Sequence, residues 1–392
     1  VMPFLSIYLH VEMGISMTAV GVVLLISAVV GALGQIVGGE LADIIGRRKI
    51  MIIAMAARCM MFLGLAYVIS GGADILVITI MVSLSSLAGS FFEPATNALI
   101  ADVVEPKKRL EAYGLLRIGG NVGWTLGPLL GGLLSMISYP FLFIISAAAT
   151  GTVSVIVFLF VAESISAGSK RQKLSLRDLG RLKDDHRFLA FCMISVPLFM
   201  MFGQMASSYA VFSTDVIGIS NAELGYLYAL NGLMVVFMQF PISRSINHYR
   251  MTRVMAAGSL LYAMGYGLVG LTPGLGEALP SWFYSPGFLY LAVCMFVVTL
   301  GEMVVSPSSM TLVAKMSPER ERGRYQGMYG LVSNFGFSAG PFFGGLLYDR
   351  FTGDPVLMWL GIGSFGLIAA LGFLGLGRTL PQKTDRIDEN DG

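Results

Sequence analysis

Residues 123–132 read GWTLGPLLGG, and residues 336–345 read GFSAGPFFGG. Both stretches have the spacing Gly-x-x-x-Gly-Pro-x-x-Gly-Gly, and the second begins 213 positions after the first. Each lies in a long apolar run, where a proline removes one helical hydrogen bond and permits a bend. The flanking glycines would let another helix approach closely. The pattern predicts two matched, bendable helices, and their bend residues are Gly123, Gly127, Pro128, Gly131, Gly336, Gly340, Pro341 and Gly344.

The similarity between the two stretches extends upstream at the same offset. Further matched pairs are Pro94 and Pro307, Arg109 and Arg322, Gly114 and Gly327, and Asn121 and Asn334. The chain therefore reads as a parallel repeat with six membrane spans in each half. Parallel repeats are one of the known constructions of transporters, with the substrate site near the middle of the membrane where the repeats meet.

Composition places this repeat in a membrane. Of the 392 residues, 55% are hydrophobic and only 13% are charged, whereas soluble domains carry about 25% charged residues. About 20 apolar residues are needed for a helix to cross the hydrocarbon layer. We expect an all-α polytopic protein with spans near 1–11, 18–45, 49–71, 75–103, 109–136, 140–162, 188–213, 222–246, 252–271, 286–315, 323–348 and 355–378.

The first of these spans is short. VMPFLSIYLHV would cover about 16 Å as a helix, which is half a bilayer. We therefore expect this sequence to begin within a helix whose first half is absent. No basic flank or cleavage site indicates a signal peptide.

Lysine and arginine indicate the orientation, because cytoplasmic loops accumulate them. The loops after spans 2, 4, 6, 8 and 10, together with the C-terminal tail, hold all but three of the 26 Lys and Arg residues. The exceptions are Arg58, Arg117 and Arg350. We expect both termini on the cytoplasmic side of a cell inner (plasma) membrane.

The predicted organisation has four parts. A first six-helix half covers 1–162, a cytoplasmic linker 163–187, a second half 188–378 and a cytoplasmic tail 379–392. The linker is the one long polar internal stretch of the sequence. Its basic residues could lie on anionic lipid head groups, or it could simply be a solvated loop.

The loop between spans 2 and 3 carries a motif. GGELADIIGRRK, residues 38–49, contains the pattern Gly-x-x-x-Asp-x-x-Gly-Arg-Arg at Gly39, Asp43, Gly46, Arg47 and Arg48. This resembles the signature loop of the major facilitator superfamily, and the resemblance covers the whole chain. A second, weaker copy lies in QFPISRSINHYRMTR, residues 239–253, where Asn247 stands in the place of Asp43.

The resemblance implies a role for the motif. In the family, such residues form a charge relay that holds the outward-open state, which here implicates Asp43, Arg47 and Arg48, with Asp102 as the second carboxylate. An anion such as Asp43 is also favoured at a helix N-terminus. The alternative is that this loop is only a turn with a positive-inside signal, but that role does not need Asp43.

Two further stretches resemble the twelve-span bacterial multidrug/proton antiporter branch of this family. GWTLGPLLGG is similar to its antiporter motif, and FFEPATNALIAD, residues 91–102, fits the same branch. Many of its proton antiporters carry an arginine four residues before a glycine in span 4. Ser85 stands there in this chain, counted from Gly89, so the usual proton-relay arginine is missing.

Ionisable residues at bilayer depth cost about 2.5–3.5 kcal/mol on insertion scales and are functional candidates by default. The candidates for proton coupling are Glu93, Arg117 and Glu302. Glu93 and Arg117 should lie at similar depth on neighbouring spans, so we expect an ion pair, either proton-linked or static. Glu302 has no cation at its depth and could carry a proton or attract a cationic substrate. A structural role is favoured for Arg58.

Uncharged polar residues supply further candidates for a substrate cavity. They are Gln35, Asn97, Asn121, Gln204, Asn231, Gln239 and Asn334, some of which would only hold helices together. The 24 Met, 25 Phe and 15 Tyr residues weakly favour an adaptable, polyspecific surface.

These features together predict a secondary active transporter, not an enzyme. We expect proton-coupled efflux of lipophilic or cationic small molecules, with the proton gradient in place of a cofactor. The predicted partners are a small-molecule substrate, protons and membrane lipids, with no nucleic acid, no metal and a monomeric state. Alternatives are a symporter or facilitator for a sugar, peptide, metabolite or lipid, and, more remotely, a membrane sensor or intramembrane enzyme. No nucleotide-binding loop and no Ser/His or HExxH constellation occurs.

Overall fold

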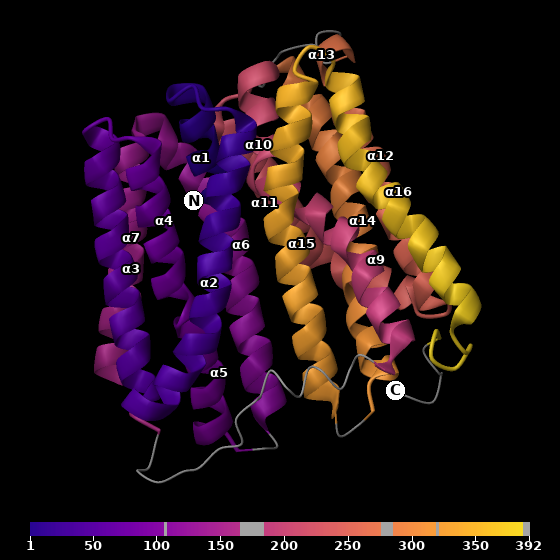
Figure 1. Ribbon diagram of the computed structural model, residues 1–392, viewed down its shortest axis with the longest axis horizontal. Coiled ribbons are helices and arrows are strands. Elements are labelled where there is room, and N and C mark those ends of the chain that lie inside the picture. Colours follow the sequence, from indigo (N-terminus) through magenta and orange to yellow (C-terminus); the bar gives the residue numbers. More distant parts are fainter. Residues whose placement is uncertain (106–107, 165–183, 276–284, 319–320, 387–392) are drawn as a thin grey trace. The chain divides into compact units, whose positions relative to one another are not determined.

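The computed structural model describes residues 1–105, 108–164, 184–275, 285–318 and 321–386 (Figure 1). Over these ranges the chain is helical throughout and contains no strand. Most of the predicted linker and the last six residues of the tail lie outside the described residues. The observed architecture is the all-α arrangement that the sequence predicts.

The chain forms two compact units. Unit 1 comprises Val1–Met13 and Val22–Gln172, and unit 2 comprises Gly14–Gly21 and Lys173–Gly392. The helices up to the end of unit 1 are α1 (Met2–Ile7), η1 (Tyr8–Glu12), α2 (Met17–Ile45), α3 (Arg47–Ser70), α4 (Ile75–Ser90), α5 (Phe92–Val103), α6 (Arg109–Ile137) and α7 (Tyr139–Phe160). Those that follow are α9 (His186–Gly203), η4 (Gln204–Ala206), α10 (Ser208–Val211), η5 (Phe212–Val216), α11 (Asn221–Ile246), α12 (Met251–Val269), α13 (Thr272–Leu275), α14 (Pro286–Met316), α15 (Arg322–Arg350) and α16 (Pro355–Thr379).

Eight helical segments of the described chain are long and apolar enough to cross a membrane. They are α2, α3, α4 with α5, α7, α9 to η5, α11, α14 and α16. Three further helices, α6, α12 and α15, are 29, 19 and 29 residues long and richer in glycine and polar residues. These segments coincide with the predicted spans to within about three residues at either end. The chain is a multi-pass membrane protein.

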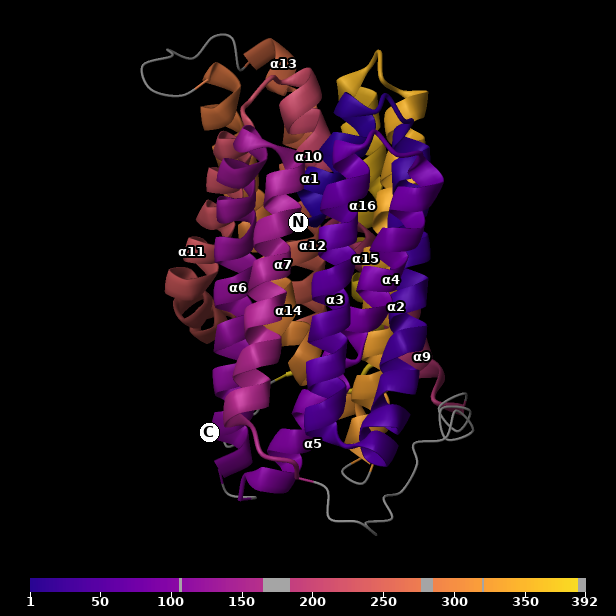
Figure 2. The same cartoon turned by 90° about the vertical axis from the view of Figure 1, so that its left-hand side faces the viewer.

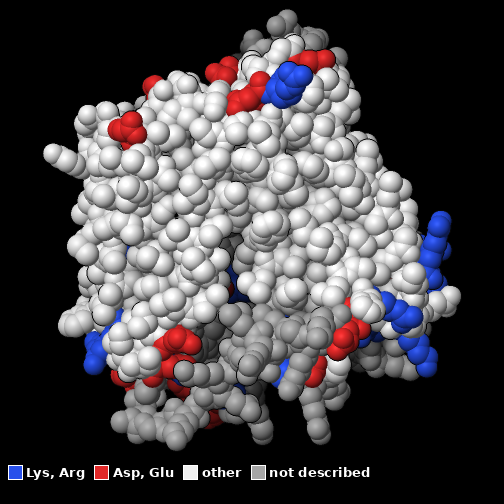
Figure 3. All heavy atoms as spheres, in the orientation of Figure 1, with Lys and Arg blue, Asp and Glu red and all other residues white. Residues whose placement is uncertain are grey.

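Helix packing within the units follows the repeat. In unit 1, α3 packs along α7, and in unit 2, α12 packs along α16 and α14 while α9 packs along α15. Figures 1 and 2 show the α3–α7 pair side by side from two directions. On the face drawn in Figure 3, most charged side chains gather near the helix ends and most of the surface between them is uncharged. This is the distribution that a hydrocarbon layer requires.

The repeated prolines of the fourth span in each half have different effects. Near Pro94 the helix is interrupted, because α4 ends at Ser90 and α5 begins at Phe92. Pro307 lies within the continuous helix α14. A proline at this position frees the carbonyl four residues earlier, which is that of Met303. The Gln239 side chain of α11 donates a 2.9 Å hydrogen bond from Nε2 to this carbonyl oxygen, so α14 remains intact.

The duplicated glycine-proline stretch is packed on one helix and open on the other. On α15, Gly336 and Gly340 lie directly against the backbone of α9, and a side chain at either position would collide with it. On α6, by contrast, a Cβ at Gly123 or Gly127 would meet no described atom within 4 Å. Gly131 alone of the α6 set is packed, against the ring of Phe4.

The start of α2 belongs to unit 2 because α15 holds it. Asp349 accepts hydrogen bonds at its Oδ1 from the Met17 amide (2.9 Å) and at its Oδ2 from the Thr18 amide (2.8 Å). The Thr18 hydroxyl also donates to Oδ2 at 2.5 Å. Gly345 lies against the Met17 carbonyl group, where a side chain would not fit. A carboxylate from another helix thus occupies the N-terminus of α2, where the dipole favours negative charge.

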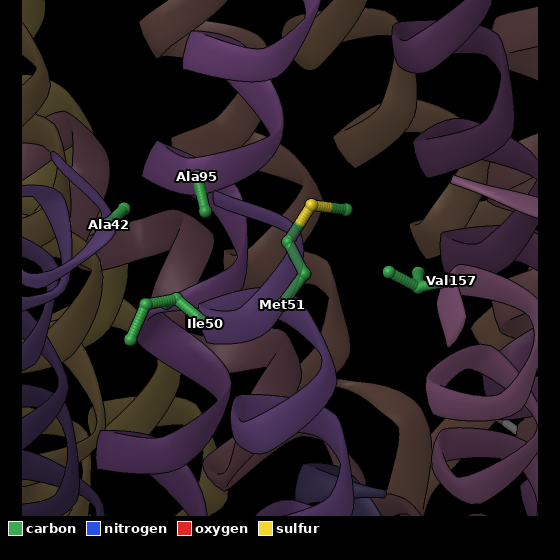
Figure 4. Close-up of a cluster of buried hydrophobic side chains, with 5 residues drawn as sticks. All are labelled: Ala42, Ile50, Met51, Ala95 and Val157. Atoms are coloured by element: carbon green, nitrogen blue, oxygen red, sulfur yellow. The ribbon is translucent and has the colours of Figure 1, made fainter. Parts of the chain in front are cut away.

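A carboxylate that follows the sixth span of each half closes the start of the third span. In unit 1, Glu163 accepts from the Arg47 amide at 2.9 Å, while Arg48 Nη2 donates to the Phe158 carbonyl oxygen at 2.6 Å. Small and apolar residues, Ala42, Ile50, Met51, Ala95 and Val157, fill the interior where α2, α3, α5 and α7 meet (Figure 4). Arginine and carboxylate thereby satisfy the free ends of two neighbouring helices.

Unit 2 has the same arrangement, built from the tail. Asp385 is fully buried and accepts from the Thr252 amide (2.8 Å), the Thr252 hydroxyl (2.7 Å) and Arg250 Nε (2.6 Å). Arg250 also donates to the Gly377 carbonyl oxygen, two residues before the end of α16. Lys315 of α14 donates to the Arg386 carbonyl oxygen at 2.7 Å. The described part of the tail is therefore packed against α12, α14 and α16.

The packing difference between the two glycine-proline stretches predicts a difference in stability. Gly340→Ala should lower the free energy of unfolding by about 1–3 kcal/mol, because the added methyl group meets the Met200 backbone. Gly127→Ala, at the matched position of α6, should cause no loss. Thermal unfolding of the purified variants in detergent measures both. Equal losses for the two variants would contradict the packing described.

Asp385→Ala should lower the free energy of unfolding by about 3 kcal/mol, since it leaves the largely buried Arg250 guanidinium and the Thr252 amide without their carboxylate. Arg386→Ala is the matched control, because the neighbouring exposed residue contributes only its backbone carbonyl. Thermal unfolding and trypsin resistance of the α11–α12 loop measure the effect. A variant with the stability of Arg386→Ala would show that the tail is not part of the fold.

Candidate functional site

The motif loop is a tight turn between α2 and α3. Gly46 has a φ of +114°, a conformation that side chains disfavour, and a Cβ there would also collide with the Glu163 carboxylate. Glycine at this position lets α3 begin immediately at Arg47. The turn directs Arg47 inward, where its side chain is 3% exposed.

The structure brings three of the four predicted relay residues together. Arg47 forms an ion pair through Nη1 with Asp102 and a weaker one through Nη2 with Asp43 at 3.5 Å. Arg47 Nη1 also donates to the Ala98 carbonyl oxygen on α5. One guanidinium thereby joins α2, α3 and α5, and its charge is balanced by two carboxylates.

Arg48 is not part of this ion-pair set. Its guanidinium lies over the Phe158 ring, 5.3 Å from the centroid, and donates to the Phe158 carbonyl oxygen. Arg48 therefore fastens α3 to the end of α7, and the relay geometry consists of Asp43, Arg47 and Asp102. Asp102 additionally accepts a 3.1 Å hydrogen bond from the Ser164 hydroxyl.

Glu93 and Arg117 do not form the expected ion pair. Among the described residues, Glu93 accepts instead from Gln35 Nε2 at 3.1 Å, and both Glu93 and Arg117 are exposed. Glu93 is the second residue of α5, which follows α4 after the single turn residue Phe91, and its carboxylate lies against Gln35 of α2. An estimate of depth along the span does not give the direction in which a side chain points.

Glu302 lies on α14 in a small polar group within unit 2. Asn231 of α11 is 2% exposed and donates through Nδ2 to Glu302 Oε2 at 2.9 Å. The same nitrogen lies 3.0 Å from the Thr299 hydroxyl oxygen. No ion pair of the described residues includes Glu302.

The other polar candidates have mixed environments. Gln204 is buried and donates from Nε2 to the Gly340 and Met200 carbonyl oxygens, so it ties α15 to α9. Gln239 donates to the Met303 carbonyl oxygen of α14. Asn97 is partly buried, and its carbonyl oxygen accepts from the Tyr113 hydroxyl at 3.0 Å. Asn121 and Asn334, the repeat-related pair, are exposed on α6 and α15. The side chains of the last two remain available to solvent or substrate.

Arg58 lies on α3, with its guanidinium 5.4 Å from the centre of the Phe62 ring and against Gly89 of α4. Ser85, one turn before that glycine, is 3% exposed. Arg58 of α3 thus lies beside Gly89. In the similar antiporters an arginine precedes this glycine by four residues on span 4, where this chain has Ser85. This contact was not predicted, because nothing in the spacing along α4 refers to α3.

Several charged residues that shape the structure were not selected from the sequence. Glu163, Asp349 and Asp385 each occupy a helix N-terminus on another element. A signal existed for two of them, because each follows the last span of a half. Among the described residues no cluster of His, Cys, Asp or Glu could hold a metal ion, and the three cysteines are free.

Comparison with known proteins identifies the family and the fold of the chain. The family model described as the Major Facilitator Superfamily matches residues 1–284 and 198–391. Multidrug resistance protein MdtH of Klebsiella pneumoniae (strain 342) is 28% identical over 378 residues, which cover 95% of this chain and 88% of that protein. The homologues and structural neighbours are transporters and not enzymes.

Two solved structures share the fold. One is a bacterial homologue of the human lysosomal transporter Spinster in an inward-facing, unoccupied conformation, with a TM-score of 0.75 and 17% identity over 99% of this chain and 95% of that one. The other is a mutant of the peptide transporter POT in complex with sulfate, with a TM-score of 0.74 and 16% identity over 98% and 92% of the two chains. Because the family model matches residues 1–284 and 198–391, the chain belongs to the Major Facilitator Superfamily.

Proposed function

We propose that the protein exports lipophilic or cationic small molecules in exchange for protons, by opening to one side of the membrane at a time. The observation that carries this proposal is Glu302, a carboxyl group inside a membrane helix that is held by Asn231 and has no ion-pair partner among the described residues. Similarity to the MdtH multidrug resistance protein supports the export of drug-like molecules.

The environment of Glu302 suits a group that gains and loses a proton. A charged carboxylate without a cation is costly at bilayer depth, and this cost favours the neutral acid. The amide of Asn231 can donate to Glu302 in either protonation state. Access of water or of a cationic substrate would stabilise the charged form, so proton release would accompany a change in what surrounds the group.

Glu93 is the second carboxyl group in this proposal. It is held by an uncharged Gln35 amide at 3.1 Å, as Glu302 is held by Asn231. Each half of the repeat thus carries one carboxyl group on its fourth span, paired with an amide from its second span. Arg117, exposed on α6, is the candidate that responds electrostatically to Glu93 when their distance changes.

The ion pairs of Arg47 with Asp43 and Asp102 suit a conformational relay. The guanidinium is nearly inaccessible, so loss of one carboxylate would leave a buried charge, which is strongly unfavourable. We propose that this relay stabilises the outward-open state, as the resemblance to the family implies. Arg48 acts beside it by holding α3 to α7.

The proposed setting is the inner (plasma) membrane, with both termini on the cytoplasmic side. The protein would act as a monomer, contact membrane lipids and use the proton gradient as its energy source. The distribution of Lys and Arg along the sequence supports the orientation.

A proton-coupled symporter or facilitator is the second candidate. The structural similarity to a peptide transporter favours it, although identities of 16–17% support the fold alone. The direction of substrate movement under a pH gradient separates the two candidates. When the outside is acidic, a symporter moves substrate into the cell, whereas an antiporter moves substrate out of it.

Glu302→Gln and Glu93→Gln should each reduce gradient-driven transport by at least tenfold, because an amide cannot exchange a proton. Fluorescent lipophilic cations taken up by everted vesicles under an imposed pH gradient provide the measurement. Glu105→Gln, in an exposed loop, is the control. The antiport proposal fails if the wild type shows no gradient-driven uptake, or if both variants transport as the wild type does.

Asp43→Asn and Asp102→Asn should each slow transport about tenfold while substrate affinity changes less than twofold. Because both carboxylates act through Arg47, the double variant should lose little more than the stronger single variant. A double-mutant cycle on transport rates measures this. Additive losses would mean that the two carboxylates act separately and that no relay exists.

A further inference from the structure

The interior of unit 2 next to Glu302 contains buried polar atoms without partners. Tyr262 and Tyr266 on α12 and Trp359 on α16 are each 0% exposed. Within the part of the chain that the structure describes, the two tyrosine hydroxyl groups and the indole N–H have no hydrogen-bond partner. Buried polar atoms are paired in more than about 90% of cases, with protein groups or ordered water. The Tyr209 hydroxyl of α10 is unpaired too, and its ring lies 6.4 Å from the rings of both Tyr266 and Trp359. This group of unpaired atoms therefore requires an explanation.

These groups form one cluster. Tyr262 and Tyr266 are four residues apart and share a face of α12, with ring centroids 6.1 Å apart. The Tyr266 ring stacks on Trp359 at 5.6 Å with an interplanar angle of 7°. Phe202 of α9 packs against Tyr262 at 4.8 Å. The cluster extends along α12 from Tyr262 toward the helix end at Val269.

Tyr262 lies directly against the segment of α14 that carries Glu302. A Cβ on Gly301 would be 2.9 Å from the Tyr262 ring and 3.0 Å from its backbone nitrogen, so only glycine permits this approach. The groups around Glu302 are thus Asn231, which donates to it, Thr299, which Asn231 also contacts, and Tyr262, which lies against the preceding Gly301. Tyr266 follows one turn further along α12, with its ring 6.1 Å from that of Tyr262.

Dry packing does not account for the hydroxyl groups. Phenylalanine would fill the same volume without burying an unpaired oxygen. By contrast, the buried hydroxyl of Tyr228 in the same unit has a partner, because it donates a hydrogen bond to the Met205 carbonyl oxygen. A buried site takes up water when it is polar, has room for the molecule and offers it several hydrogen-bond partners.

We infer that ordered water enters this part of unit 2, and that Tyr262 and Tyr266 relay protons between Glu302 and the end of α12 at Val269. This inference rests on the proposed proton coupling at Glu302. In each step a hydronium ion on one side gives a proton to the hydroxyl oxygen while the tyrosine's own O–H proton passes to a water molecule on the other side, which becomes hydronium, so the tyrosine ends neutral and one proton has moved. The distribution of Lys and Arg places the Val269 end on the outer side.

Tyr262→Phe and Tyr266→Phe test the relay, because each removes one oxygen and keeps the ring. Proton-driven transport should fall at least fivefold in both variants, and the pH dependence of the rate should shift. Substrate affinity in detergent should stay within twofold, which also establishes that the variants fold. Phe202→Leu, which changes the packing beside Tyr262 without removing an oxygen, is the control and should transport at a rate near that of the wild type.

The Glu302→Gln background separates a relay from a general defect. There, Tyr262→Phe should have no further effect, since the acceptor of the proton is already absent. If either Tyr→Phe variant transports as the wild type does, or if its loss adds fully to that of Glu302→Gln, the relay is wrong. Failure of the proposed function is a different result, in which the wild type itself shows no gradient-driven transport.

Discussion

A hydrocarbon layer offers no hydrogen-bond partner, and this constraint explains most of the polar contacts in the structure. Every charge, amide and helix end at depth must be satisfied by another part of the chain. The same requirement holds for a charge buried at a helix end: the guanidinium of Arg47, the first residue of α3, is nearly fully buried and is matched by Asp43, Asp102 and the Ala98 carbonyl oxygen. Pro307 illustrates it for the backbone, since Gln239 supplies the donor that the proline removes from the Met303 carbonyl oxygen. Wherever such a partner is a titratable group, the same contact can also respond to protons.

The two units meet this constraint at corresponding places with different residues. Glu163 closes the start of α3, and Asp385, from the tail, closes the start of α12. The second-half loop carries Asn247 where the first carries Asp43, so the carboxylate beside its arginine comes from a more distant part of the chain. Gln35 meets a carboxylate on the fourth span, whereas Gln239 meets a backbone carbonyl oxygen. The two halves therefore make these contacts at corresponding places but with different residue types. As a result, the titratable side chains differ between the halves.

The spans, the parallel repeat and the contact of Arg47 with both carboxylates could be predicted from the sequence, because hydropathy, spacing and motif are local properties. The partners of Glu93 and Asp385 could not. Depth along a span does not fix the direction of a side chain, and Glu93 lies against Gln35 of α2 and not against Arg117. The contacts of Asp385 with Thr252 and Arg250 depend on how the tail folds back onto α12. From sequence alone, a charged residue after the last span is expected to be solvated. The glycines were predicted to be alike in both copies, yet those of α15 are packed and most of those of α6 are open, because packing is a property of the neighbours.

The central claim is that substrate export is thermodynamically linked to proton entry through the carboxyl groups of the fourth spans. Purified protein in liposomes measures this link: for each of several substrate concentration ratios, the pH gradient is varied until the net substrate flux is zero. The account predicts a reversal point that moves in proportion to the logarithm of the substrate ratio, and no such movement in Glu302→Gln. A net flux that vanishes only when the substrate concentrations are equal, whatever the pH gradient, would contradict it.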